Sequence, residues 1–370
     1  MNRKSVSALT IGFIGLGLIG GSIAKSIRKF FPKYRIIAHS HTPATTEQAL
    51  TDGLIDQICT ERDPAFGSCD MIFLCAPVQT NMTYLPFLKK ILKPGCILTD
   101  VGSVKNEMHE AVRTAGLAGS FIGGHPMTGS EKTGLANAKD YLLENAYYVI
   151  TPNPESDQAA VDFYVSLVSA LGAIPLVLPP GEHDYIVAGV SHLPHILASC
   201  LVNTVASLDN EKEQMKLVAA GGFKDITRIA SSSPVMWQQI CLSNDTQILK
   251  VLDTFIQSMQ DARSRIAAKN SDGLMDMFTH SRDYRDSLLD TVSGPVARQY
   301  VMYVDIYDEP GGIATITTML AISGINIRNI GIIHNREFEE GVLRIEFDNE
   351  QHHLKALEIL KNHNYVVRKY

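Results

Sequence analysis

The sequence lacks the features that define three common classes of protein. No run of about 18 apolar residues occurs in the 370-residue chain, so we predict no membrane-spanning helix and no membrane partner. Basic residues number 33 against 39 acidic ones, and the formal charge of −6 argues against a nucleic-acid surface, which needs clustered Lys and Arg. The six cysteines form no CxxC pair and no metal-ligand spacing, so we expect reduced thiols, a cytoplasmic location and no metal site.

What the chain contains is typical of a soluble globular protein, with 45% hydrophobic and 19% charged residues. A length of 370 residues exceeds one ordinary core, so two or three domains are expected. The N-terminal stretch MNRKSVSALTIGFIGLG is basic and then apolar, as in a signal peptide. Because glycines interrupt it and no clean cleavage site follows, we interpret it as a first strand.

The first domain, residues 1–180, opens with the pattern of a dinucleotide-binding turn. Apolar residues precede Gly15, Gly17 and Gly20, which form G-x-G-x-x-G at the start of a helical pattern. These glycines permit a tight turn, close approach of the backbone to a pyrophosphate, and close packing of helix on strand. Free N–H groups at the start of the helix then bind the phosphates. The alternative is a glycine-rich turn that binds no ligand.

A further absence concerns the ribose of such a cofactor. A NAD site usually carries Asp or Glu at the end of the second strand, about 20 residues beyond the glycines. The strand at 35–40 ends instead in His39 and Ser40, followed by His41. Neutral His and Ser can hydrogen-bond either ribose, and no Arg follows there for a 2′-phosphate, so we expect NAD and keep NADP open. Alternatively, His39 and His41 are solvated loop residues.

Strand and helix patterns alternate through the rest of this domain. The alternation predicts a parallel, doubly wound Rossmann-type α/β sheet with its ligands at the carboxyl ends of the strands. The loops DVGSVK, 100–105, and GGHPMTGSE, 123–131, both follow such ends. The second loop therefore lies beside the nicotinamide, if one binds. Strand patterns lie at 70–78, 96–105, 146–151 and 174–179, and helical patterns at 80–92, 106–115 and 155–171.

The middle of the chain, residues 181–293, is predicted to be all-α. Its segment 184–208 is largely apolar, and such helices need burial on several sides, so we predict a dimerisation domain. The alternative is a bundle within one chain. The segment SHLPH places His192 and His195 on one helical face, either in the core or against a substrate. The two histidines could also bind a metal ion, but the sequence offers no third ligand at a suitable spacing.

A second polar segment of this domain, GGFKDITRIASS, carries Lys224 and Arg228 four residues apart on a helix. Arginine is suited to bidentate binding of a carboxylate. The alternative is an exposed Arg228 paired with Asp225. Residues 298–370 change pattern again, to β-α-β-β-α-β, which is the order of a ferredoxin-like α+β module. No cluster of nucleophile and base lies in this last segment, so we interpret it as regulatory.

The segments GLGLIGGS, DVGSVK, GGHPMTGSEKTG, SHLPH and GGFKDITRIASS make residues 1–290 resemble the prephenate dehydrogenase family. The tail, with DEPGGIATITTMLAISGINI, resembles an ACT domain, a module that typically binds amino acids. The resemblance implies a homodimer that converts prephenate to 4-hydroxyphenylpyruvate and CO₂ with NAD(P)⁺ on the way to tyrosine. It also implies tyrosine as the effector that binds the tail.

Roles for individual residues follow from the same resemblance. His125 accepts the proton of the ring hydroxyl of the substrate, Ser103 hydrogen-bonds near that hydroxyl, and Arg228 holds a substrate carboxylate. The other substrate contacts are His192, His195, Glu131, Thr133, Trp237 and Gly221. The cofactor contacts are Gly15, Gly17, Leu18, Ile19, Gly20, His39, Ser40, Ala76, Pro77 and Ser103. The regulatory residues are Gly311, Gly312, Ile313 and Asn326.

Three alternatives remain. Arogenate dehydrogenase shares the fold and chemistry, and the sequence does not separate it from prephenate dehydrogenase. Two-domain dehydrogenases of 3-hydroxy acids use a Lys in the helical domain, but no Lys or Arg occurs from Leu176 to Glu211. A sensor that binds nucleotide without turnover is the third, and Ser103, His125 and Arg228 together argue against it. For the tail, the alternative is a dimerisation module without a ligand.

Overall fold

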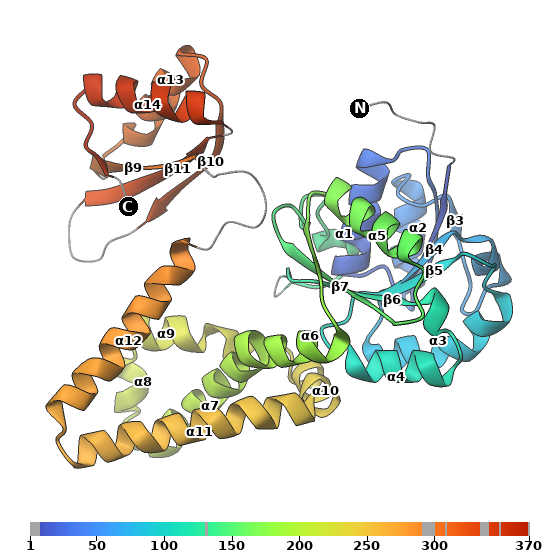
Figure 1. The fold of residues 1–370 in the computed structure, drawn as a ribbon, viewed down its shortest axis with the longest axis horizontal. Helices are drawn as coiled ribbons and strands as arrows, with labels where there is room; N and C mark the ends of the chain where they lie inside the picture. Colours follow the sequence, from blue (N-terminus) through green and yellow to red (C-terminus); the bar gives the residue numbers. More distant parts are fainter. Residues whose placement is uncertain are drawn as a thin grey trace. The chain divides into compact units, whose positions relative to one another are not determined.

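Two compact units make up the chain (Figure 1). The computed structural model describes residues 8–129, 132–290, 300–307, 309–333, 340–347 and 349–368. One unit runs from Met1 to Ser264 and the other from Arg265 to Tyr370. The domain borders expected at 180 and at 293–298 stay predictions, and the second falls outside the described residues.

The first unit is built on a five-stranded parallel sheet of order β3-β2-β1-β4-β5. Helices α1, α2 and α5 pack on one face, and α3 and α4 on the other (Figure 1). Because both faces are covered, β4 and β5 are buried throughout. The strands are β1 (Thr10–Ile14), β2 (Arg35–His39), β3 (Gln57–Ile58), β4 (Met71–Leu74) and β5 (Ile97–Asp100). The helices are α1 (Leu18–Phe30), α2 (Pro43–Thr51), α3 (Val78–Ile91), α4 (Asn106–Thr114) and α5 (Gln158–Ala170).

A second sheet of three strands departs from the prediction. Strand β6 (Ile122–Pro126) pairs antiparallel with β7 (Tyr147–Pro152), which pairs parallel with β8 (Ile174–Val177). The prediction of a loop at 123–131 is therefore wrong in its first half, and so is that of a wholly parallel sheet. The glycines there serve close packing, because a Cβ on Gly124 would lie 2.5 Å from the hydroxyl of Tyr164.

A chain of buried hydroxyl groups joins the two sheets through α5. Thr99 Oγ1, on β5, donates to Tyr164 Oη at 2.9 Å, and Tyr164 Oη lies 2.8 Å from Tyr148 Oη on β7. All three residues are buried. Between β5 and β6 themselves, the Leu98–Phe121 bridge makes the connection.

The rest of the first unit is helical, as predicted. Helix α6 (Pro180–Val187) continues through a π-helical turn, η4 (Ala188–His192), into α7 (Leu193–Leu208). After α7 come α8 (Gln214–Val218), α9 (Gly221–Thr227), the 3₁₀ turn η5 (Arg228–Ser231), α10 (Pro234–Ser243) and α11 (Asp245–Ala267). Among the described residues, the continuous helix Pro180–Leu208 is long and apolar enough to cross a membrane by length and composition alone. Polar side chains interrupt it, so it contains no uninterrupted apolar run of about 18 residues. One helix of this kind is weak evidence for a membrane span, because core helices of soluble proteins pass the same test.

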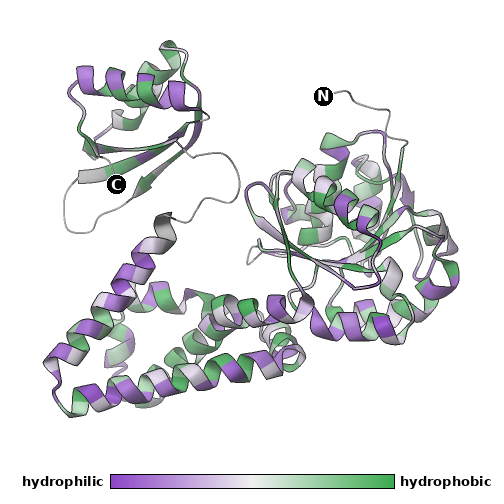
Figure 2. Cartoon of the chain, in the orientation of Figure 1, coloured by the Kyte–Doolittle hydropathy of each residue, from purple (hydrophilic) through white to green (hydrophobic). Residues whose placement is uncertain are grey.

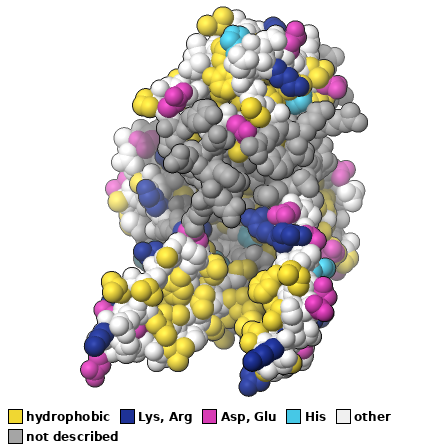
Figure 3. All heavy atoms as spheres, turned by 90° about the vertical axis from the view of Figure 1, so that its left-hand side faces the viewer, with side chains coloured by type: hydrophobic (Ala, Val, Ile, Leu, Met, Phe, Trp, Pro, Cys, Tyr) yellow, Lys and Arg dark blue, Asp and Glu magenta, His cyan; other side chains and the backbone are white. Residues whose placement is uncertain are grey.

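Hydrophobic side chains stay exposed on this helical part. Figure 3 shows hydrophobic side chains gathered over the lower part of that view, and in Figure 2 α11 alternates between hydrophilic and hydrophobic residues along its length. An extended apolar surface of this kind marks an interaction site. The strongly exposed members from this unit are Val190, Leu208, Leu217, Val218, Ile226, Val235 and Leu242.

The second unit contains α12 (Ser271–Asp290) and then elements in the predicted order β-α-β-β-α-β. Its antiparallel sheet has the order β10-β11-β9-β12, and apolar residues of α13 and α14 pack against the strands. These elements are β9 (Tyr300–Tyr307), α13 (Gly312–Ile322), β10 (Ile327–Ile333), β11 (Glu340–Phe347), α14 (Glu350–Asn362) and β12 (Val367–Arg368).

The hydroxyl chain gives a first prediction. Tyr164→Phe leaves the hydroxyls of Thr99 and Tyr148 without their shared partner, so the free energy of unfolding should fall by about 1–3 kcal/mol. Urea titration followed by circular dichroism measures this change. Tyr147→Phe is the control, because that side chain is 41% exposed and its loss should change stability by less than about 0.5 kcal/mol. Equal stability of Tyr164→Phe and the control would contradict the proposed link between the sheets.

Candidate functional site

The glycine-rich turn has the geometry of a dinucleotide site. Gly15 has a φ of +97°, and its N–H donates to the carbonyl oxygen of His39 at 2.8 Å, which ties the turn to the end of β2. A Cβ on Gly20 would lie 2.5 Å from the carbonyl oxygen of Gly15, so helix and turn need a glycine there. Gly17 caps α1 without a side chain, and its Cβ would meet nothing within 4 Å. The uncapped helix start and the open space fit a pyrophosphate.

At the end of β2, His39 is held in place rather than solvated. Its Nδ1 lies 3.2 Å from the carbonyl oxygen of Cys59, so Nδ1 carries the proton and Nε2 is free to accept a hydrogen bond. Ser40 follows directly. The remaining predicted cofactor residues lie on the same edge of the sheet, with Leu18 and Ile19 in the first turn of α1 and Ala76 and Pro77 between β4 and α3. Contacts of all these residues with a cofactor stay predictions.

The predicted base, His125, is half-buried and is the first member of a hydrogen-bonded chain that runs into the interior. Its Nδ1 lies 2.8 Å from Nε2 of His183, and Nδ1 of His183 lies 2.8 Å from Oδ1 of Asp184. A carboxylate only accepts, so His183 donates from Nδ1 and accepts at Nε2. With His183 in its neutral form, His125 then donates from Nδ1. This assignment leaves the lone pair on Nε2 of His125, which can take a proton.

The carboxylate at the end of this chain is held firmly. The two oxygens of Asp184 accept the backbone N–H groups of Lys105 and Asn106, each at 2.8 Å, at the start of α4. A negative charge is favoured at a helix N-terminus, and Asp184 is fully buried. The side-chain amide of Asn244 donates to the carbonyl oxygen of Asp184 at 2.9 Å and lies 3.2 Å from Nδ1 of His192.

The surroundings keep His125 neutral. Burial lowers its pKa well below the usual 6.5, and nearby His183, Lys105 and His192 lower the pKa further. Burial also lowers the pKa of His192 to about 4. At pH 7 the imidazole of His125 is therefore in the form that can accept a proton.

The helical part contributes a cluster of packed aromatic rings. The rings of His195 and Trp237 stack with centroids 3.8 Å apart, and His192 meets the same indole edge-on at 5.9 Å. The Trp237 N–H is buried and has no hydrogen-bond partner among the described residues. Burial lowers the pKa of His195, and the positive charge of Arg228 lowers it further, so Arg228 lies close to this group. Arg228 begins η5, one residue beyond the helix on which the sequence placed it.

The other predicted site residues have clear positions. Ser103 lies in the loop between β5 and α4, and Gly221 begins α9. Thr133 is exposed, and its carbonyl oxygen accepts from the side chain of Asn137 at 2.7 Å. Glu131 falls outside the described residues. The contacts of these residues with a substrate stay predictions.

Sequence reasoning missed His183 and Asp184, as well as the anchoring role of Asn244. The segment PPGEHD, residues 179–184, spans the domain border predicted at 180, and a His-Asp pair at the entrance of an apolar helix is an unusual polar feature. That His-Asp pair is the sequence signal that could have identified these two residues. No cluster of potential metal ligands occurs among the residues that the structure describes.

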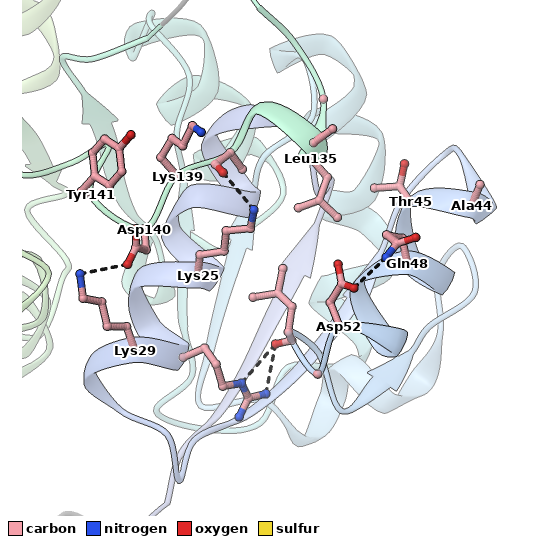
Figure 4. A pocket seen from close by; sticks show the side chains of 16 residues that line it. Lys25, Lys29, Ala44, Thr45, Gln48, Asp52, Leu135, Lys139, Asp140 and Tyr141 are labelled. Atoms are coloured by element: carbon pink, nitrogen blue, oxygen red, sulfur yellow. Dashed lines mark hydrogen bonds and ion pairs between the residues drawn. The ribbon is translucent and has the colours of Figure 1, made fainter.

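A cleft of about 1160 Å³ lies away from this site, between α1, α2 and residues 134–141 (Figure 4). Lys25 donates to the carbonyl oxygen of Ala138, and Lys29 pairs with Asp140, both at 2.9 Å. None of the predicted catalytic residues lines it. We therefore locate the candidate active site at the carboxyl end of the sheet and not in this cleft.

A dinucleotide-binding turn and a neutral imidazole beside the end of β5 define a nicotinamide-dependent oxidoreductase. Comparison with known proteins gives the family. The model described as "Prephenate dehydrogenase, nucleotide-binding domain" matches residues 23–176, and "Prephenate dehydrogenase, dimerization domain" matches 179–280. The prephenate dehydrogenase of Bacillus subtilis (strain 168) is 38% identical over 349 residues, 94% of each chain. That of Lactococcus lactis subsp. cremoris (strain MG1363) is 34% identical over 94% of this chain and 96% of its own. The chain belongs to the prephenate dehydrogenase family and is an NAD-dependent enzyme.

Solved structures agree with this assignment. The prephenate dehydrogenase of A. aeolicus, in complex with hydroxyphenyl propionate and NAD⁺, is 30% identical, with a TM-score of 0.73 over 77% of this chain and 100% of that one. The arogenate dehydrogenase of Synechocystis is also 30% identical, with a TM-score of 0.69 over 76% of this chain and 100% of that one. The expectation of NAD as cofactor is confirmed.

The glycine turn gives a second prediction. Gly17→Ala places a methyl group in open space, so stability should be unchanged, while the dissociation constant for NAD⁺ should rise by about tenfold or more because the pyrophosphate needs that space. Gly20→Ala should instead lower the free energy of unfolding by about 1–3 kcal/mol through overpacking. Fluorescence titration with NAD⁺ and urea unfolding separate the two effects. Normal NAD⁺ affinity in Gly17→Ala would contradict the placement of the pyrophosphate.

Proposed function

We propose that the chain catalyses the oxidative decarboxylation of prephenate to 4-hydroxyphenylpyruvate in tyrosine biosynthesis, as a cytoplasmic homodimer. The observation that carries the proposal is the chain from Asp184 through His183 to His125, which leaves Nε2 of His125 as the acceptor. Its relatives at 34–38% identity are prephenate dehydrogenases. A cyclohexadiene with a ring hydroxyl and a ring carboxylate needs one base and one carboxylate-binding cation, and the site offers both.

The residues have distinct tasks in this reaction. NAD⁺, when bound at the glycine turn, supplies the hydride acceptor. His125 Nε2 takes the proton of the ring hydroxyl, and the resulting positive charge lies one imidazole away from Asp184. Arg228 holds a substrate carboxylate in bidentate fashion, and the unpaired N–H of Trp237 donates to the substrate. Loss of the ring carboxylate as CO₂ makes the ring aromatic, so positioning is the main demand on the protein.

The same site suits arogenate, which has an amino group where prephenate has a keto group. The arogenate dehydrogenase of Synechocystis, at 30% identity over its full length, supports this second candidate. Both substrates share the ring hydroxyl and the ring carboxylate, so His125 and Arg228 serve either one. The ratio of kcat/KM for prephenate and arogenate decides between them.

We also propose that the dimer forms through the exposed apolar surface of the helical part. The match to the family's dimerization domain, residues 179–280, covers the helices that carry this surface. Side chains such as Leu217 and Val218, 80% and 73% exposed in the single chain, would be covered by the partner.

Residues 298–370, the part of the second unit that follows α12, are proposed to be an ACT module that binds tyrosine. The described elements there have the β-α-β-β-α-β order, and the Bacillus subtilis relative matches over 94% of this chain, which is more than the residues before this module can account for. Gly311 caps α13 with a φ of +95°, and exposed Asn326 directly precedes β10. Inhibition requires that tyrosine bind two states of the enzyme unequally.

A third prediction tests the base. His125→Asn removes the proton acceptor, so kcat should fall by about 10²–10⁴-fold while the dissociation constant for NAD⁺ stays unchanged. Because the base acts in its neutral form and its pKa lies well below 6.5, kcat/KM of the native enzyme should stay level as pH falls from 7.5 to 6.5 and decline only below that. NADH absorbance with NAD⁺ and prephenate measures both. The control is His280→Asn, exposed on α12. Near-native turnover of His125→Asn would exclude the assignment.

A fourth prediction tests the regulatory unit. Tyrosine should lower the rate of the native enzyme, and Asn326→Ala should raise the inhibitory concentration by about 5-fold or more, within the usual range of allosteric coupling. Asn362→Ala, at the exposed end of α14, is the matched control. A native rate that tyrosine leaves unchanged would reduce this unit to an assembly module, and equal inhibition of both variants would move the tyrosine site elsewhere.

A further inference from the structure

A fully buried ion pair lies directly behind the proposed active site. Lys105 Nζ contacts Oδ2 of Asp100, and both side chains have 0% exposure. Burying two charges costs free energy that their attraction repays only with good geometry and further hydrogen bonds, and apolar residues of similar size often serve stability equally well. A role in folding is therefore a weak explanation for this pair, and its other contacts point to a different one.

The pair holds both backbone groups of Gly124, the residue before His125. Oδ1 of Asp100 accepts the Gly124 N–H at 3.2 Å, and Lys105 Nζ donates to the Gly124 carbonyl oxygen at 2.7 Å. The two backbone groups of Gly124 thus pair with side chains and not with the backbone of β5. Gly124 cannot shift or turn without breaking a charged hydrogen bond, and the position of the His125 backbone is fixed with it.

The same pair closes the loop that carries Ser103. Asp100 ends β5, Lys105 precedes α4, and the residues between them form the loop. Oδ2 of Asp100 also accepts the N–H of Gly102 at 3.0 Å, which ties the interior of the loop to its base. One ion pair therefore sets the positions of the predicted hydrogen-bonding residue and of the predicted base.

Lys105 also connects to the far end of the histidine chain. Its backbone N–H donates to Oδ1 of Asp184, the oxygen that accepts from His183. The contacts form a closed path from Asp184 through His183 and His125 to Gly124, and back through Lys105 to Asp184. His125 is thereby held at its imidazole from one side and at its backbone from the other.

We propose that Asp100 and Lys105 are positioning residues that hold His125 and the Ser103 loop in the mutual geometry that proton transfer needs. The proposal rests on the proposed role of His125 as the base. Neither residue is assigned contact with substrate or cofactor. Among the described residues, the charged and titratable groups around His125 are Lys105 and Asp100 beside β6, His183 and Asp184 from α6, and His192 from η4.

The experiment compares Lys105→Met with the double variant Asp100→Asn/Lys105→Met. Lys105→Met leaves a buried carboxylate unpaired, so it should unfold at lower urea concentration. The double variant removes both charges and should regain most of that stability. Its kcat should nevertheless stay at least about tenfold below native, because a loose base no longer meets the substrate in line, while NAD⁺ affinity changes less than twofold.

The pH profile supplies a readout that a purely structural role would leave unchanged. Lys105 contributes to lowering the pKa of His125, so the acid limb of kcat/KM in Lys105→Met should move to higher pH. Lys90→Met, exposed on α3, is the control for loss of one positive charge. Native kcat in the double variant, together with a native pH profile in Lys105→Met, would overturn the proposal.

Two further variants, Asp100→Asn and His125→Asn, separate failure to fold and failure of the proposed function from loss of positioning. If neither methionine variant folds, Asp100→Asn alone, which keeps the size of the side chain, is judged by the same kcat and pH readouts. Rates of the native enzyme and of His125→Asn report on the proposed function itself. A native enzyme that turns over prephenate and loses activity in His125→Asn, but not in the ion-pair variants, would refute the positioning role alone.

Discussion

The buried carboxylate of Asp184 is the group on which the site depends. It accepts two backbone N–H groups at the start of α4 and the ring N–H of His183, so a charge with 0% exposure is fully hydrogen-bonded. Because Asp184 belongs to α6 and α4 belongs to the Rossmann part, this one carboxylate joins the helical part to the sheet. It also determines which nitrogen of each following imidazole carries a proton.

From that constraint the chemistry of His125 follows. A free histidine would be partly protonated near its pKa of about 6.5 and would have no preferred tautomer for a base. Here burial and nearby positive charge lower the pKa of His125, and hydrogen bonding commits its Nδ1 to His183. The enzyme thereby keeps a neutral base with its lone pair on Nε2, while Trp237 packs against His195 and against His192, which itself lowers the pKa of His125.

The sequence predicts the parts of this architecture that depend on local signals. Three features depend on signals that extend over about 30 residues, the length of one βαβ unit. They are the G-x-G-x-x-G turn, the alternation of strands and helices through β5, and the apolar helices, and the structure agrees with them. The prediction of a loop at Gly123 and Gly124 is wrong because glycine usually indicates a loop, whereas here Gly124 allows β6 to approach Tyr164 and Asp100. The contacts of His125 with His183, and of Lys105 with Asp184, span 58 and 79 residues. No local pattern encodes such contacts, although the motif resemblance did identify His125 and Arg228 as site candidates.

The most direct test of this account is the tautomer of His125. Nitrogen-15 NMR of histidine-labelled protein at pH 7, with the resonance assigned by its loss in His125→Asn, reports which ring nitrogen is protonated. The account predicts a neutral imidazole with the proton on Nδ1 and none on Nε2. A proton on Nε2, or on both nitrogens, would contradict the chain from Asp184 and the assignment of His125 as the base.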